Sequence, residues 1–188
     1  MTQFEYVAVL ISIIVGLALA QILRGIGRIA TDKSSPKPYW VHLVLTVYLF
    51  FYVTMFWWWE FQLVASEWSL SLYAVLIVYA TLLFFASLLF QPSNLHGIEN
   101  FKDYYYEKRR IIYGTVIAIN FWDIVDTLAK GAIHLTDLGT VYIAGTALNF
   151  ALSVLAIYTA NERFHQLCVI LLTGTFTTNM IVLFSVIE

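Results

Sequence analysis

The sequence predicts an all-α polytopic integral membrane protein with six transmembrane helices in a compact bundle. Hydrophobic residues make up 61% of its 188 residues, charged residues only 12%, and the mean hydropathy is +0.79. In a soluble domain about a quarter of all residues are charged, so this composition excludes an ordinary soluble protein. Six apolar stretches are each long enough to cross a hydrocarbon core of ~30 Å, which takes roughly 20 helical residues. The basic residues also gather at one end of the predicted spans.

The six predicted spans cover, in chain order, residues 5–23, 39–59, 70–90, 111–129, 138–160 and 166–187. They form one domain over residues 1–188, because no stretch is left for a separate soluble module. Residues 99–110 predict a short amphipathic helix that lies in the interface before the fourth span, with Phe101, Tyr104 and Tyr105 on one side. The first 23 residues contain no Lys or Arg, so we expect the first span to be retained rather than cleaved as a signal peptide.

The ten Lys and Arg residues predict the orientation of the chain. Nine of them fall in loops on one face: Arg24, Arg28, Lys33, Lys37, Lys102, Lys108, Arg109, Arg110 and Arg163; Lys130 alone lies on the other. Lys and Arg near span ends stay in the cytoplasm, so both termini are expected to be extracytoplasmic. The general pattern is similar to that of small bacterial membrane proteins, which implies the cytoplasmic (inner) membrane.

Basic residues next to the spans are also candidates for binding. Arg24 and Arg28, together with the run Lys108, Arg109 and Arg110, form a surface suited to anionic lipid or to a cytoplasmic protein partner. The net charge of −2 gives no indication of a nucleic-acid partner. The predicted surroundings are therefore the lipid bilayer and, as an alternative role, a docked soluble protein.

Small residues recur every four positions along the first span, at Ala8, Ser12, Gly16 and Ala20. Small side chains let helix backbones approach closely, and in lipid this packing is a main source of association. The stripe therefore predicts contact with another helix, either of this chain or of a second copy. A homo-oligomer is expected, because six spans enclose little interior.

Asp123 is the main candidate functional residue. An ionisable group in hydrocarbon costs ~2.5–3.5 kcal/mol on insertion scales, so it marks a functional site by default. At about 1.5 Å per residue, Asp123 lies about two thirds of the way along its span. Asp126 has Lys130 four residues later as an ion-pair partner, but Asp123 has no such partner in its own helix. Asp123 is expected to be protonated, hydrated or bonded to another span.

Further polar residues fall inside the last three predicted spans, namely Asn120, Asn149, Ser153, Thr175 and Asn179. Amides at these depths would not face lipid. They predict hydrogen bonds between helices, a hydrated ion path, or a bound lipid or cofactor. Glu5 and Glu60, near the opposite ends of their spans from the basic loops, predict an acidic mouth that would concentrate cations.

Metal, haem and catalytic sites are weakly indicated. His42, His165 and Cys168 lie near span ends and could bind a metal, and paired histidines could hold a haem. No H-E-x-x-H or C-x-x-C pattern occurs, so no metal or cofactor is predicted. Walker A, G-x-S-x-G and dinucleotide-binding patterns are also absent, and no catalytic residue is assigned. An intramembrane enzyme that uses Asp123 with His134 stays open as an alternative.

These observations favour a small oligomeric channel or transporter that moves a proton or a small cation through a polar path around Asp123. The alternative is a non-catalytic membrane subunit or sensor, whose basic loops dock a soluble partner or anionic lipid. The two hypotheses differ in what they expect of the polar residues. Transport requires a hydrated route to Asp123, whereas a subunit requires only that each amide be satisfied.

Overall fold

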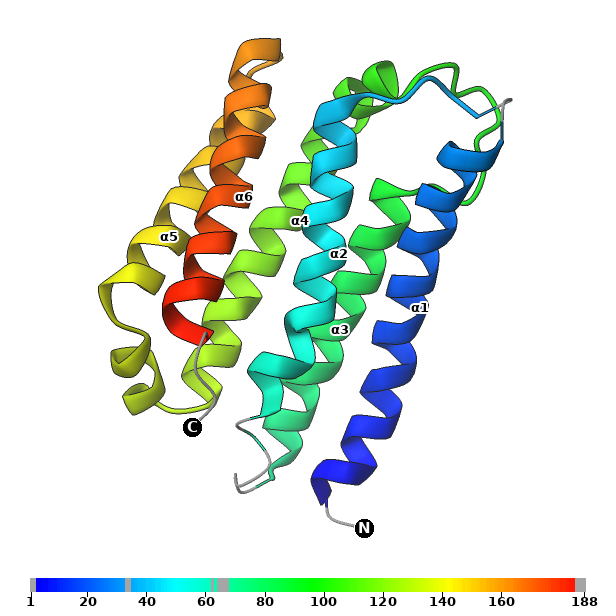
Figure 1. Ribbon diagram of the computed structural model, residues 1–188. Coiled ribbons are helices and arrows are strands. Elements are labelled where there is room, and N and C mark those ends of the chain that lie inside the picture. Colours follow the sequence, from blue (N-terminus) through cyan, green and yellow to red (C-terminus); the bar gives the residue numbers. More distant parts are fainter. Residues whose placement is uncertain (1–2, 33–34, 62, 64–67, 185–188) are drawn as a thin grey trace. The chain divides into compact units, whose positions relative to one another are not determined.

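The computed structural model describes residues 3–32, 35–61, 63 and 68–184 (Figure 1). Six helices follow one another: α1 Gln3–Thr31, α2 Trp40–Glu60, α3 Leu70–Phe90, α4 Phe101–Ala129, α5 Ala132–Tyr158 and α6 Glu162–Phe184. Each is long and apolar enough to cross a membrane. The predicted all-α class and the six spans are therefore confirmed. The described residues fall into two compact units, Met1–Glu107 and Lys108–Glu188, so a single six-span domain stays a prediction.

In the first unit, α1 packs most closely against α3. Its buried face consists of Val7, Ile11, Val15, Ala18 and Ile22. The stripe of small residues lies on a different face, because Ser12, Gly16 and Ala20 are exposed and Ala8 is half-buried. A Cβ added to Gly16 would meet no described atom within 4 Å. Among the described residues of the first unit, the stripe is therefore not packed against another helix, and its contact with a helix of this chain or of a second copy stays a prediction.

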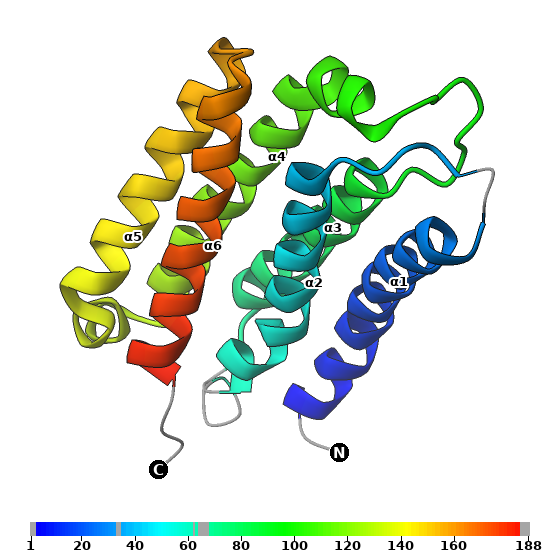
Figure 2. The same ribbon diagram turned by 45° about the horizontal axis from the view of Figure 1, so that its top comes forward.

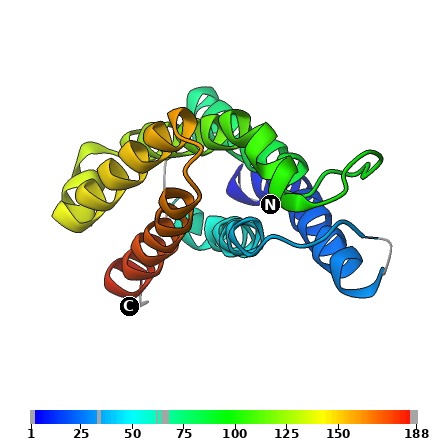
Figure 3. The same cartoon turned by 90° about the horizontal axis from the view of Figure 1, so that it is seen from above.

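The connection from α3 to α4 lies beside the end of α1 (Figures 1 and 3). Arg28 of α1 donates hydrogen bonds to the carbonyl oxygens of Pro92 and Ser93, at 2.8 and 3.1 Å. Lys37 and Asn100 form an isolated parallel bridge, which ties the first loop to the residues that precede α4. Main-chain and side-chain bonds thus hold the loops of this end together.

Helix α4 is continuous over 29 residues, so the segment predicted as a separate interfacial helix is its first part. Asn100 caps the helix, since its Oδ1 accepts the Asp103 N–H at 2.8 Å. No Gly or Pro interrupts the chain between this cap and Gly114, so nothing ends the helix before the apolar run. Its aromatic side does not face lipid: Phe101 and Tyr105 are buried, and the Tyr104 hydroxyl donates to the Leu89 carbonyl at 2.7 Å.

The second unit contains the rest of α4 with α5 and α6, and α5 and α6 run side by side (Figure 2). Their short connection is capped by Asn161, whose Oδ1 accepts the N–H of Arg163 at 2.9 Å. Helix α5 is interrupted at Gly139, which has φ 64° and ψ −161°. Such a backbone conformation favours glycine. The regular part of α5 therefore begins after Gly139, close to the predicted start of the fifth span.

Candidate functional site

The Asp123 cluster consists of Asp123 and Thr127 of α4 and Tyr142 of α5. The Tyr142 hydroxyl donates to Asp123 Oδ2 at 2.8 Å, and the Thr127 hydroxyl lies 3.1 Å from the same tyrosine oxygen. Since the single tyrosine proton points to the carboxylate, Thr127 is the donor in the second bond. Thr127 and Tyr142 are buried and Asp123 is half-buried. Of the three states expected for Asp123, the structure shows the one in which it bonds to another span.

Asp126 forms the predicted ion pair with Lys130, with 2.6 Å between Asp126 Oδ2 and Lys130 Nζ. The two side chains are only 4% and 6% exposed, so the pair is buried rather than at the surface. Removing one partner of a buried pair costs roughly 3–5 kcal/mol, because the other charge is left uncompensated. Asp126 is therefore a structural residue here, and its charge is balanced by Lys130 within the same helix.

The predicted amides divide into separate contacts. Asn149 of α5 is buried, and its Oδ1 accepts a hydrogen bond from Thr175 of α6 at 2.6 Å. The side-chain amide of Asn179 packs against Gly145, where a Cβ would lie 3.1 Å from the amide nitrogen. Asn120 donates to the Val116 carbonyl of its own helix at 3.0 Å. Two of these three amides thus join α5 to α6, and the third stays within α4.

The Tyr113 cluster consists of Tyr113 of α4 with His165 and Cys168 of α6, all fully buried. The Tyr113 hydroxyl lies 3.5 Å from His165 Nδ1 and also hydrogen-bonds the Cys168 thiol. That thiol reaches the Leu152 carbonyl of α5 at 4.0 Å. Ser153, the residue after Leu152 in the sequence, is fully buried, and its hydroxyl has no hydrogen-bond partner among the described residues.

Four polar side chains of α5 follow one another along one face of the helix: Tyr142, Thr146, Asn149 and Ser153. Thr146 hydrogen-bonds the Tyr142 hydroxyl, and Tyr142, Asn149 and Ser153 are buried. Of the side chains in these contacts, Asn149 and Ser153 were predicted from the sequence, and Tyr142, Thr146, Thr127 and Tyr113 were not. Thr127 lies four residues after Asp123 and Thr146 three before Asn149, whereas Tyr142 and Tyr113 lie seven residues before Asn149 and Asn120. Spacings of three, four and seven residues place side chains on one face of a helix, and this was the available signal.

The first unit contains a different set of buried polar groups, the His42 network, made of Gln21, His42, Thr46 and Gln91. His42 Nε2 lies 2.6 Å from the Phe90 carbonyl oxygen, and the Thr46 hydroxyl donates to the His42 carbonyl at 2.9 Å. The Gln91 amide donates to Thr46 at 3.1 Å, and Gln21 donates to the Gln91 carbonyl at 2.5 Å. The network fastens the end of α3 to α1 and α2.

The weak metal candidates are not brought together. His42 stacks on Phe101, with ring centroids 4.9 Å apart, and its Nε2 is occupied by the Phe90 carbonyl. His165 and Cys168 are bonded to Tyr113 instead. Among the described residues, no group of three or more His, Cys, Asp or Glu side chains is arranged to hold a metal ion. His42 and His165 are thus each bonded to protein groups.

The predicted charged surfaces are only partly exposed. Arg24 and Arg110 are exposed, Lys108 and Arg109 are half-buried, and Arg28 is bonded to the loop after α3. Glu5 is exposed, but Glu60 is 1% exposed at the end of α2. An acidic mouth open to solvent needs both carboxylates at the surface, and Glu60 does not lie there, so the mouth predicted from Glu5 and Glu60 stays a prediction.

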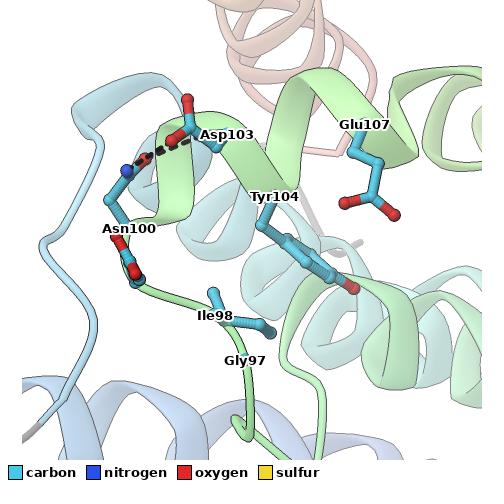
Figure 4. Close-up of a pocket in the computed structure, with 7 residues that line it drawn as sticks. Gly97, Ile98, Asn100, Asp103, Tyr104 and Glu107 are labelled. Carbon is cyan, nitrogen blue, oxygen red and sulfur yellow. Dashed lines mark hydrogen bonds between the residues drawn. The ribbon is translucent and has the colours of Figure 1, made fainter.

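A pocket of about 200 Å³ lies at the start of α4 (Figure 4). Its lining consists of Gly97, Ile98, Glu99, Asn100, Asp103, Tyr104 and Glu107. Figure 4 shows the Asn100 side chain bonded to Asp103, so one of the three carboxylates already serves the helix cap. The residues that line the pocket belong to the first unit, and those of the Asp123 cluster belong to the second.

No protein-family model, curated protein or solved structure matches the chain.

Proposed function

We propose that this chain is a membrane channel or transporter that moves protons, with Asp123 as the proton-binding group. The observation that carries the proposal is the hydrogen bond from the Tyr142 hydroxyl to Asp123 at 2.8 Å, extended by Thr127 at 3.1 Å. Within a span, these side chains form a short series of exchangeable O–H groups that ends on a carboxylate. Such a series can deliver a proton to Asp123 or take one from it without any large movement of the helices.

The donor set favours a proton over a metal cation. Hard cations such as Ca²⁺ take roughly six to eight oxygen ligands. The Asp123 cluster offers one carboxylate and two hydroxyls, and one of the hydroxyl protons already points to the carboxylate. A proton, by contrast, requires a single basic oxygen and a neighbouring donor. The wider prediction of a proton or small cation is therefore narrowed here to a proton.

The orientation and the assembly are part of the same proposal. The excess of basic residues at one end of the spans supports cytoplasmic loops 31–38 and 91–110, with both termini outside. The exposed stripe of Ser12, Gly16 and Ala20 supports a homo-oligomer in which two copies of α1 approach closely. The bacterial inner membrane is the proposed location.

A second candidate function is a membrane subunit that does not transport. It is favoured by the way the amides are satisfied, since Asn149 bonds Thr175 and Asn120 bonds its own helix. Such pairs serve as interhelical or local contacts worth about 0.6 kcal/mol each. In this case the exposed Arg24 and Arg110 would bind anionic lipid or a soluble protein partner.

Proton flux into liposomes distinguishes the two functions. The purified protein is reconstituted with a pH-sensitive dye inside, and a potassium gradient with valinomycin supplies the driving force. Transport predicts rapid acidification with the wild type and a loss of roughly a hundredfold with Asp123→Asn, which keeps the shape but removes the proton-binding oxygen. Glu5→Gln is the matched control, because it neutralises an exposed carboxylate outside the cluster. Wild-type flux equal to that of empty liposomes would contradict transport and favour the subunit.

A further inference from the structure

The Tyr142 hydroxyl is bonded to three side chains from two helices. It donates to Asp123 Oδ2 at 2.8 Å, the Thr127 hydroxyl lies 3.1 Å from it, and Thr146 of α5 bonds it as well. A phenolic hydroxyl has one hydrogen to donate and an oxygen that accepts hydrogen bonds. Because the hydrogen points to the carboxylate, both threonines must donate to the oxygen. The hydrogen-bonding capacity of the hydroxyl is then filled.

The two threonines occupy equivalent positions on their helices. Thr127 follows Asp123 by four residues on α4, and Thr146 follows Tyr142 by four residues on α5. Side chains four residues apart lie one above the other on the same face of a helix. Tyr142 and Thr127 are buried, and Thr146 is half-buried. Each helix thus supplies one threonine to the same tyrosine oxygen.

A threonine inside a helix can also donate to the backbone carbonyl four residues earlier. Thr115 of α4 makes this bond with the Ile111 carbonyl at 2.9 Å, and threonines of α2 and α6 make it too. Thr127 and Thr146 direct their hydroxyls at the Tyr142 side chain. These two threonines therefore act on a side chain, where others in the chain bond their own backbone.

Two donors on the tyrosine oxygen restrict where its hydrogen can point. A hydroxyl hydrogen rotates about the C–O bond to suit its surroundings. With Thr127 and Thr146 both donating, the direction that remains for the Tyr142 hydrogen is the one toward Asp123. The carboxylate then faces a donor of fixed orientation. A donor oriented in advance stabilises a charge without any cost of reorganisation when the charge develops.

We propose that Thr127 and Thr146 are positioning residues, which hold the hydrogen of the Tyr142 hydroxyl on the Asp123 carboxylate. The inference rests on the proposed proton transport, in which Asp123 binds the proton. Both threonines act through Tyr142, whichever route the proton takes to Asp123. Their hydroxyl groups carry this role, and their methyl groups do not.

Valine and serine substitutions separate these two parts of each threonine. Thr127→Val and Thr146→Val keep the shape and remove the hydroxyl, so each is expected to lower proton flux in the liposomes roughly tenfold. Thr127→Ser and Thr146→Ser keep the hydroxyl and should stay within about twofold of the wild type. Thr115→Val is the matched control, because it removes a buried threonine hydroxyl from α4 outside the cluster. The opposite order, with valine active and serine impaired, would show a packing role and overturn the proposal.

The infrared absorption of the Asp123 carboxylate tests the same point without transport. Its band is obtained by subtracting, in each background, the spectrum of Asp123→Asn from that of the protein with Asp123, in lipid and without a proton gradient. The position of the band depends on the hydrogen bonds that the carboxylate accepts. Thr127→Val and Thr146→Val should move the band in the same direction as Tyr142→Phe does. The serine variants and Thr115→Val should leave it in place.

The outcomes separate this inference from the proposal beneath it. A band that stays in place in both valine variants would overturn the positioning role, and so would wild-type flux in both. A band that moves in the valine variants, when the wild type shows no flux, would contradict proton transport alone and leave the orientation of Tyr142 standing. Thermal unfolding in detergent checks that each variant folds. If one valine variant does not fold, the other, on a different helix, decides the matter.

Discussion

Both units of the chain bury polar side chains, but they place them differently. In the first unit, Gln21, His42, Thr46 and Gln91 gather at one end of the helices and bond mainly to backbone carbonyls. In the second unit the polar groups are spread along α5. Asp123 and His165 there face hydroxyl groups, which can exchange protons. Both histidines are held at Nε2 by a backbone carbonyl, His42 by that of Phe90 and His165 by that of Thr159. They differ at the other face of the ring, because His42 stacks on Phe101 whereas His165 Nδ1 lies 3.5 Å from the Tyr113 hydroxyl.

This difference indicates how buried polarity can be assigned to structure or to function. A carbonyl oxygen accepts hydrogen bonds and cannot pass a proton on, so we interpret the His42 network as a structural contact that fixes the chain connection after α3. Hydroxyls and carboxylates both give and take protons. We therefore propose that the polar groups of the first unit contribute to stability, and that Asp123 with its hydroxyl neighbours Thr127 and Tyr142 in the second unit serves transport. The predictions that follow test this division, in order of decreasing effect.

Gly25→Leu should have the largest effect on stability. A Cβ on Gly25 would collide with the side chain of Gln91, which is buried and bonded to Thr46. Overpacking of this kind costs roughly 1–3 kcal/mol, and loss of the Gln91 bond adds about 1 kcal/mol. The total loss of stability is obtained from the unfolding free energy in detergent. Gly27→Leu is the matched control, because no described atom lies within 4 Å of its Cβ. Equal destabilisation by the two variants would show that the close approach at Gly25 does not matter.

Asn149→Leu and Thr175→Val should have a smaller effect on the unfolding free energy than Gly25→Leu. The two side chains share one hydrogen bond of 2.6 Å between α5 and α6. A double-mutant cycle on the unfolding free energy should give a coupling of about 0.6 kcal/mol. A coupling above about 2 kcal/mol would make this pair a main structural contact. It would contradict the view that buried polar groups contribute to stability chiefly in the first unit.

Gly16→Leu should have the smallest effect on the isolated chain. Gly16 is exposed and a Cβ there meets no described atom, so the unfolding free energy of the monomer should change by less than about 0.5 kcal/mol. Light scattering in detergent should nevertheless show a smaller assembly if two α1 helices meet along this stripe. Destabilisation without any change of assembly would mean that the stripe packs within the chain after all.

The helices could be predicted from the sequence because length and hydropathy are sufficient for that purpose. The third span was predicted at residues 70–90 and α3 is Leu70–Phe90, with Ser69 as its cap. The buried face of α1 could not be predicted. Lipid and protein interior are equally apolar, so the residues on the two faces of the helix do not differ in hydrophobicity. Tyr142 was missed for a related reason: a tyrosine near a span end also fits the aromatic belt at the headgroups.

A side-by-side comparison of His42→Phe and Asp123→Asn tests the division between the units most directly. Phenylalanine keeps the stacking on Phe101 but leaves the Phe90 carbonyl without its donor, which costs roughly 1–3 kcal/mol. We therefore expect His42→Phe to lower the unfolding free energy and to leave the proton flux per folded molecule unchanged. Asp123→Asn should do the reverse, with flux lost and stability kept within about 1 kcal/mol. Loss of flux in His42→Phe at full folding, or full flux in Asp123→Asn, would contradict the assignment of transport to the second unit.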